Sequence, residues 1–181
     1  AWGSSHVEAW GSSHVEARGN VIIRLFSALM IKASASVIIM LHGNARSIDG
    51  GQQIKAEKPA TAESWCAFYG IDITAGVALL YKAVNDDYTS PHGTSYAPGT
   101  TPQANDWDGG IAECGGGLHF SPTPRHALSF YSSAVRFVAC GVKLSEIVVH
   151  PDGQYPEKIK APRVAEACYE VDRDGRPTSG H

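Results

Sequence analysis

Cys114 and His119 stand on either side of three glycines in the segment IAECGGGLHF, and their types and spacing suggest chemistry. A cysteine with a histidine nearby can form an activated thiolate or half of a zinc site. Zinc needs four ligands, or three and a water, and no ligand pair of standard close spacing completes the set. A structural cysteine beside a histidine on a strand is the simpler interpretation, and we predict no metal site.

The glycines at 115–117 raise a second chemistry, because the backbone N–H groups of a glycine-rich loop can bind an anion. The chain has no strand–GxxxxGK[ST]–helix signature, so a P-loop is excluded. Close packing or a β-bulge explains the glycines adequately.

Lys82 lies in VALLYKAV (77–84), which predicts a buried strand of the same domain. A site built from Lys82 and His119 needs both side chains at one cavity, together with a facing carboxylate. The candidate carboxylates are Glu113, Glu166 and Glu170. We expect partial convergence, with His119 hydrogen-bonded and mostly buried near the centre of a sheet and Lys82 pointing to solvent.

Further elements must position these residues. Two short helices are predicted: one from Thr61 as N-cap to Gly70 at its end, with an aromatic stripe that would cover a neighbouring surface, and one with Thr123 as N-cap and Pro124 at N1. Strands are predicted in IAECGGGLHF, AVRFVACGVKL, EIVVH and RVAEACYEV, after a long loop over 85–110. The sequence therefore predicts a linker and capping helix over 51–76, then a small α+β domain over 77–176 with a mostly antiparallel sheet.

The first 48 residues repeat with a period of eight: AWGSSHVE, AWGSSHVE, ARGNVIIR, LFSALMIK, ASASVIIM, LHGNARSI. Apolar residues fall on positions five, seven and one of the octads, which is the spacing of a strand, and small residues fall where the chain must turn. Stacked strands at a short fixed period are typical of a β-solenoid. We predict a mainly β protein with a β-solenoid over 1–50, of about three coils.

In this repeat we expect Ile22, Ile31 and Ile38 to be nearly fully buried. The residues expected to face outward are Trp2, His6, Glu8, Trp10, His14, Glu16, Arg18 and Arg24. A helix over 21–41 is the alternative, but paired Val and Ile and the absence of caps favour strands. The chain begins inside a repeat, so residues 1–8 would expose a strand edge with Ala1 and Val7 on its inner face. That edge predicts further repeats or self-association.

The composition of the chain limits which classes of binding partner the protein can have. Hydrophobic residues make up 43% and charged residues 18%, which is typical of a globular chain, and the net charge of −3 argues against nucleic acid or an anionic membrane as partner. Arg24 and Lys32 interrupt the longest apolar run, so it does not read as a membrane span. Four cysteines without a C-x-x-C pair leave two disulfides open, but they favour buried thiols in a reducing, cytoplasmic compartment.

The segments LYKAVNDDYTSPHG, YAPGT, AECGGGLHFSPTPRHALSFY and KIKAPRVAEACYEV, taken in order, resemble an uncharacterised family of small phage and bacterial domains, over about residues 77–172. Many members of that family carry octad solenoid repeats in front. The resemblance implies a fold and a domain arrangement but no established activity.

The order of the elements is also similar to that of ADP-ribosyltransferase folds. That resemblance implies NAD as cofactor, with Lys82 holding it, Tyr131 supporting the nicotinamide and Glu166 or Glu170 polarising the ribose. The sequence departs from that family's pattern in three ways. Lys82 stands where arginine or histidine is usual, and no Ser-Thr-Ser strand is present. The acidic residues Glu166 and Glu170 also lack the family's spacing.

Three functional classes remain open. The first is a structural or binding protein without a cofactor, in which a solenoid spacer carries a small docking domain. The second is an NAD-dependent transferase that uses Lys82, His119, Tyr131 and Glu166. The third is a small-ligand pocket between the 85–110 loop and GGGLHF. The space beside Lys82 and His119 separates the first class from the second, because a filled cleft there would exclude the enzyme.

Overall fold

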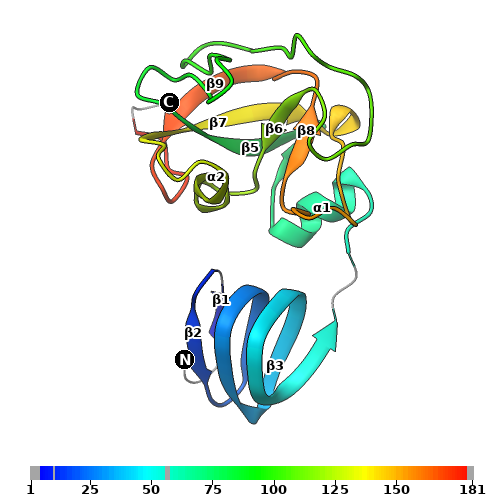
Figure 1. The fold of residues 1–181 in the computed structure, drawn as a ribbon, viewed down its shortest axis with the longest axis vertical. Coiled ribbons are helices and arrows are strands. Elements are labelled where there is room, and N and C mark those ends of the chain that lie inside the picture. Colours follow the sequence, from blue (N-terminus) through cyan, green and yellow to red (C-terminus); the bar gives the residue numbers. More distant parts are fainter. Residues whose placement is uncertain (1–4, 10, 56–57, 179–181) are drawn as a thin grey trace. The chain divides into compact units, whose positions relative to one another are not determined.

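The structure, a computed structural model, describes residues 5–9, 11–55 and 58–178 (Figure 1). The chain divides into two compact units, Ala1–Lys58 and Pro59–His181. The described residues are mainly β, with two short α-helices and one 3-10 turn. The prediction of a mainly β protein is therefore confirmed.

The first unit consists of strands β1 (Ser5–Ala9), β2 (His14–Ala17) and β3 (Val21–Lys55). β1 and β2 each pair with β3 in parallel, and both ladders join residues sixteen positions apart, as in Ser5 with Val21 and His14 with Met30. Figure 1 shows β3 as one ribbon that bends back over itself instead of running straight. Residues 21–41 therefore form strand, as the paired Val and Ile favoured, and not a helix.

The core of the first unit is a column of small and aliphatic side chains. Its buried members are Ala9, Ala17, Val21, Ile23, Leu25, Ala28, Ile31, Val37 and Ile39. Ile31 is fully buried as predicted, but the same prediction is wrong for Ile22 and Ile38, which are half-buried. Side chains alternate along a strand, so Ile23 and Ile39, one position on, point into the core in their place.

The residues predicted to face outward in the first unit are mostly exposed. The exposed ones are His6, Glu8, His14, Glu16 and Arg18. Arg24 is half-buried, while Ala1, Trp2 and Trp10 lie outside the described residues.

The second unit is built on an antiparallel sheet in the order β4-β5-β7-β9. Its strands are β4 (Ile73–Thr74), β5 (Val77–Val84), β7 (Arg136–Lys143) and β9 (Glu166–Val171). Strands β6 (Leu118–Phe120) and β8 (Ile159–Ala161) form a second antiparallel pair. A bridge between Tyr81 and Ser121 joins β5 to the segment after β6, which brings Lys82 and His119 close together.

Helices α1 (Ala62–Tyr69) and α2 (Pro124–Phe130) begin and end where their capping residues predict. The Thr61 side chain accepts from the Ser64 N–H, and Gly70 ends α1 in the left-handed conformation. Thr123 caps α2 in the same way, and Pro124 is its first residue. The Trp65 side chain is fully buried in the second unit, where its Nε1 donates to the Pro156 carbonyl oxygen across 2.8 Å.

Two predicted strands are absent. EIVVH follows a 3-10 turn, η1 (Leu144–Glu146), and contributes only a single bridge between Val148 and Lys160. Residues 111–117 form turns and bends, and the strand begins only at Leu118. No helix of the described residues is long and apolar enough to cross a membrane.

Candidate functional site

The second unit contains a cleft of about 750 Å³, which we call the Lys82 cleft. Its walls come from β5, β6, α2, the loop over 90–96 and the loop over 104–117. The polar and aromatic side chains that line it are Tyr81, Lys82, Ser90, His92, Thr94, Tyr96, Asn105, Asp106, Cys114, His119, Phe120, Ser121, Phe130, Tyr131 and Lys158.

Three of the four predicted site residues, Lys82, His119 and Tyr131, line this cleft, and Glu166 does not. Glu166 is exposed at the start of β9 and lies over Gly141 of β7. The other two candidate carboxylates also lie elsewhere. Glu113 accepts from the backbone N–H groups of residues 154 and 155, and Glu170 pairs with Arg136.

Lys82 faces the interior, and the expectation that it points to solvent is wrong. It lies two residues after Leu80 on β5 and therefore on the same face of the strand, with Ala78 and Leu80 fully buried there. Its Nζ donates to the main-chain oxygen of His119 across 2.8 Å and lies 5.5 Å from the centre of the Tyr96 ring. Burial lowers the pKa of Lys82 to about 8.

His119 on β6 is hydrogen-bonded, as predicted, but it is only half-buried, and its strand belongs to a two-stranded ladder and not to the centre of a sheet. Its Nε2 lies 3.2 Å from the Glu113 main-chain oxygen, which can only accept, so Nε2 carries the proton and Nδ1 is the acceptor nitrogen. Burial, and then the charges of Lys82 and Lys158, lower the pKa of His119 to about 4. His119 is therefore neutral at neutral pH.

Cys114 is an exposed free thiol at the mouth of the cleft, and Lys158 donates to its Sγ across 3.5 Å. The Lys158 Nζ also lies 5.4 Å from the centre of the Tyr155 ring and 5.8 Å from that of Phe130. Within the described part of the chain no three His, Cys, Asp or Glu side chains gather as a metal site would require.

The glycines at 115–117 serve close packing. A Cβ at Gly116 would lie 1.6 Å from the Asp106 main-chain oxygen, and one at Gly117 would lie 2.8 Å from the Trp107 ring. The Gly115 N–H donates to the Ala112 oxygen and the Gly117 N–H to the Asp106 carboxylate. Because both groups already have acceptors within the protein, this loop is not an anion-binding loop.

Lys160 anchors the loop that carries these glycines. It is fully buried on β8, where it pairs with His119 in the ladder. Its Nζ lies 3.1 Å from the Asp108 carboxylate and 5.4 Å from the centre of the Trp107 ring. One wall of the cleft is thereby tied to the strand behind it.

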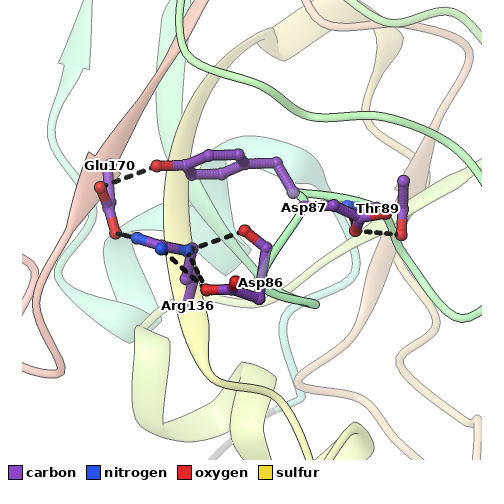
Figure 2. Close-up of polar contacts among 6 residues, drawn as sticks. Asp86, Asp87, Thr89, Arg136 and Glu170 are labelled. Atoms are coloured by element: carbon purple, nitrogen blue, oxygen red, sulfur yellow. Dashed lines mark hydrogen bonds and ion pairs between the residues drawn. The ribbon is translucent and has the colours of Figure 1, made fainter.

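A second polar network fixes the loop that follows β5 (Figure 2). Arg136 of β7 pairs with Asp86 at 2.7 Å and with Glu170 of β9 at 2.9 Å. The Tyr88 hydroxyl donates to the other Glu170 oxygen across 3.0 Å, and Arg136 lies over the Tyr88 ring. Glu170 is therefore held by Arg136 and Tyr88, outside the cleft.

The start of this loop is also held from the side of α2. The Tyr131 hydroxyl donates to the Asn85 side-chain oxygen, which fixes the Tyr131 ring at the edge of the cleft. Thr89 closes a tight turn by donating to Asp87, from both its N–H and its hydroxyl. The 85–110 loop, expected to be long and irregular, is therefore ordered by side-chain contacts at its beginning.

Sequence reasoning placed a possible pocket between the 85–110 loop and GGGLHF but singled out none of the lining residues Tyr96, His92, Asp106 and Lys158. All four lie in loops, where no periodicity marks which side chains turn inward. Only Lys158 had a local signal, since the alternation in KIK marks the approach of a strand.

A search of curated proteins and a search of solved structures found no match. Residues 78–172 match the family described as domain of unknown function DUF7666, a stretch that begins in β5, ends just after β9 and includes all four predicted site residues. The expectation of an uncharacterised family over about 77–172 is confirmed, and the chain belongs to the DUF7666 family.

Proposed function

We propose that this chain is a binding protein of phage or bacterial type, in which a β-solenoid spacer carries a small docking domain with the Lys82 cleft as its ligand site. The observation that carries the proposal is the cleft itself. Its volume of about 750 Å³ is within the usual range for small-molecule sites, and it gathers aromatic walls around a few polar groups. Contacts at residues 85–89 and the Lys160–Asp108 pair hold the loops that form its walls, which supports a preformed cleft.

Several features of the first unit support a solenoid. The sixteen-residue offset of both parallel ladders is twice the octad period, so two octads would make one coil. Side chains sixteen apart share the same core, as in Val7, Ile23 and Ile39. A narrow core that repeats at the period of the backbone is what stacked coils require.

Contacts along β3 support the same proposal. The Ser36 hydroxyl donates to the Gly19 oxygen across 2.9 Å, which links residues seventeen apart. Gly50 and Gly51 have positive φ and approach Ala33 so closely that a Cβ at Gly50 would lie 2.1 Å from its main-chain oxygen. Such contacts belong to the corners where successive coils touch.

The association and location of the protein are further parts of the proposal. Among the described residues β1 pairs only with β3, and its other edge would pair with another copy or with further repeats, because a strand edge is a template for pairing. Cys66, Cys140 and Cys168 are buried free thiols, which supports a reducing, cytoplasmic setting.

A ligand screen on the full chain tests the proposed site. Thermal shift with neutral and charged small molecules would be measured for the wild type and for a variant that fills the cleft, Thr94→Trp. Thr101→Trp, at an exposed position that does not line the cleft, is the matched control. We expect ligands that stabilise the wild type and Thr101→Trp but not Thr94→Trp. Binding that survives in Thr94→Trp would place the ligand site elsewhere.

An NAD-dependent ADP-ribosyltransferase-like effector is the second candidate. It is favoured by one observation, that Lys82, His119 and Tyr131 line the same cleft. The positions of the two carboxylates predicted to polarise the ribose weaken this candidate, because Glu166 does not line the cleft and Glu170 is held by Arg136. Melting temperatures with and without NAD, for the wild type, Lys82→Ala and His119→Ala, test it. A clear NAD shift in the wild type that both variants lose would replace the first proposal by this one.

A further inference from the structure

Two lysines of the second unit extend from strands into the fold, and their surroundings differ. Lys160 is fully buried and has a counter-ion, the Asp108 carboxylate at 3.1 Å. Lys82 has no ion pair within the described part of the chain, and its Nζ has a main-chain oxygen as hydrogen-bond acceptor and an aromatic ring beside it. Lys82 is also the one of the two that lines the cleft.

An ammonium group withdrawn from water without a counter-ion is unfavourable, and buried charges in proteins are normally paired. The lowered pKa of Lys82 reflects the same cost, since burial favours the neutral amine. Lys82 is half-buried and lines an open cleft, not a sealed core, so a bound molecule can supply the missing negative charge.

Lys158 adds a second positive charge to the same lining. It too forms no ion pair among the described residues, and it is close enough to Lys82 and His119 to lower the pKa of both. The carboxylate among the lining residues belongs to Asp106, which accepts the Gly117 N–H. The cleft therefore concentrates positive charge in a chain whose net charge is −3.

The remaining walls suit a flat apolar group. Among the aromatic lining residues, Phe130 and Tyr131 have exposed surface, whereas Tyr96 and Phe120 are fully buried and pack edge-to-face, with their ring centres 6.1 Å apart. Aromatic walls bind planar rings through stacking and edge contacts, while ammonium groups fix an anionic end.

We propose that the Lys82 cleft binds an anionic small molecule of roughly nucleotide size, with a planar portion against the aromatic walls and a phosphate or carboxylate held by Lys82 and Lys158. This inference rests on the proposed function, because it names the ligand class of the same cleft.

Two matched pairs of probes test the charge directly: AMP against adenosine, and indole-3-acetate against indole-3-acetamide. Within each pair the ring system is the same and only one member is anionic, so the pairs also distinguish phosphate from carboxylate. Affinities for the full chain would be measured by calorimetry at low ionic strength. We expect the anionic member of at least one pair to bind about tenfold or more tightly than its neutral partner, which is the range for hydrogen bonds to charged groups.

Variants assign the effect to the two lysines. Lys82→Met and Lys158→Met keep the aliphatic stem and remove the charge, and each should abolish the preference for the anion. Lys143→Met, which removes the same charge from an exposed position outside the cleft, should keep it. Lys82→Met should also melt at a higher temperature than the wild type without ligand, because it removes a buried charge that lacks a counter-ion. That shift is measured independently of binding.

Three results would overturn the inference. If the neutral members bind as tightly as the anions, and Thr94→Trp abolishes that binding, the ligand cleft stands but its proposed anionic ligand is wrong. If neither anion binds the wild type, or if both lysine variants keep the preference, the inference is also wrong.

Discussion

Cys140 of β7 and Cys168 of β9 face one another across adjacent strands, with their sulfur atoms 3.1 Å apart. Both thiols are buried and free, and they lie beside the β-bulge between Ala139 and Gly141. The sequence, in which the two cysteines are 28 residues apart, offered no motif to pair them. The antiparallel ladder brings them into contact.

We expect this pair to form a disulfide when the protein is refolded with an oxidised small-molecule disulfide. The two thiols lose two protons and two electrons to the reagent, which leaves as its two thiols. Closing the loop should raise the free energy of unfolding by about 3 kcal/mol. Peptide mass spectrometry and denaturant unfolding measure the two effects. Cys168→Ser should show neither, and a bond to Cys66 or Cys114 instead would contradict the predicted pairing.

Ile31→Asp should unfold the first unit. Ile31 is fully buried among aliphatic side chains, and an unpaired carboxylate there costs about 4 kcal/mol or more. Circular dichroism and proteolysis would show the loss of the first unit. Lys32→Asp, at the next and exposed position, is the control and should stay folded. If both variants behave alike, the described core is not what stabilises this unit.

Stability should fall as the pH drops from about 6.5 to about 4. Burial lowers the pKa of His119 and of His126 from 6.5 to about 4, so between these values the unfolded chain binds more protons than the folded one. The stabilisation is complete above the unfolded pKa and is lost as the pH falls through the folded pKa. Urea unfolding across this range measures it, and His119→Gln with His126→Gln should flatten the profile. An unchanged slope would show that these histidines are not buried as neutral groups.

Arg136→Met should loosen the loop after β5 without unfolding the sheet. The variant loses the pairs with Asp86 and Glu170, which are partly exposed and screened by solvent, so each pair contributes little to stability. A double-mutant cycle with Glu170→Gln should give a coupling energy of similar size. Hydrogen exchange at residues 86–89 should speed up in the variant. A coupling energy of zero would mean that the network in Figure 2 does not hold the loop.

Local chemistry predicted the local elements well. Thr61, Thr123 and Gly70 act through their own side chains or backbone conformation, so helix ends could be read from the sequence. EIVVH has the composition of a strand, but a 3-10 turn precedes it and only one bridge pairs with it. Strand formation depends on a partner, which a sequence pattern does not reveal.

The candidate site was predicted only in part, and Lys82 shows why. The alternation in VALLYKAV places Lys82 on the same face as Ala78 and Leu80, which was enough to predict that it turns inward. The ordinary preference of lysine for the surface pointed the other way. Lys158 and Tyr96 reach the same cleft from distant loops, and their convergence follows from the tertiary fold alone.

The sixteen-residue offset of the parallel ladders affects which insertions and deletions the first unit can tolerate during evolution. Gain or loss of sixteen residues leaves every other pairing in register, whereas an odd number would turn the apolar face outward. In the proposed solenoid, length would therefore change in steps of one strand spacing, about 4.8 Å, without new core residues. Residues 1–8 and 9–16 are identical, and such tandem copies are where slipped replication and unequal recombination act. In that proposed solenoid, duplication alone would be enough to change the length of the first unit.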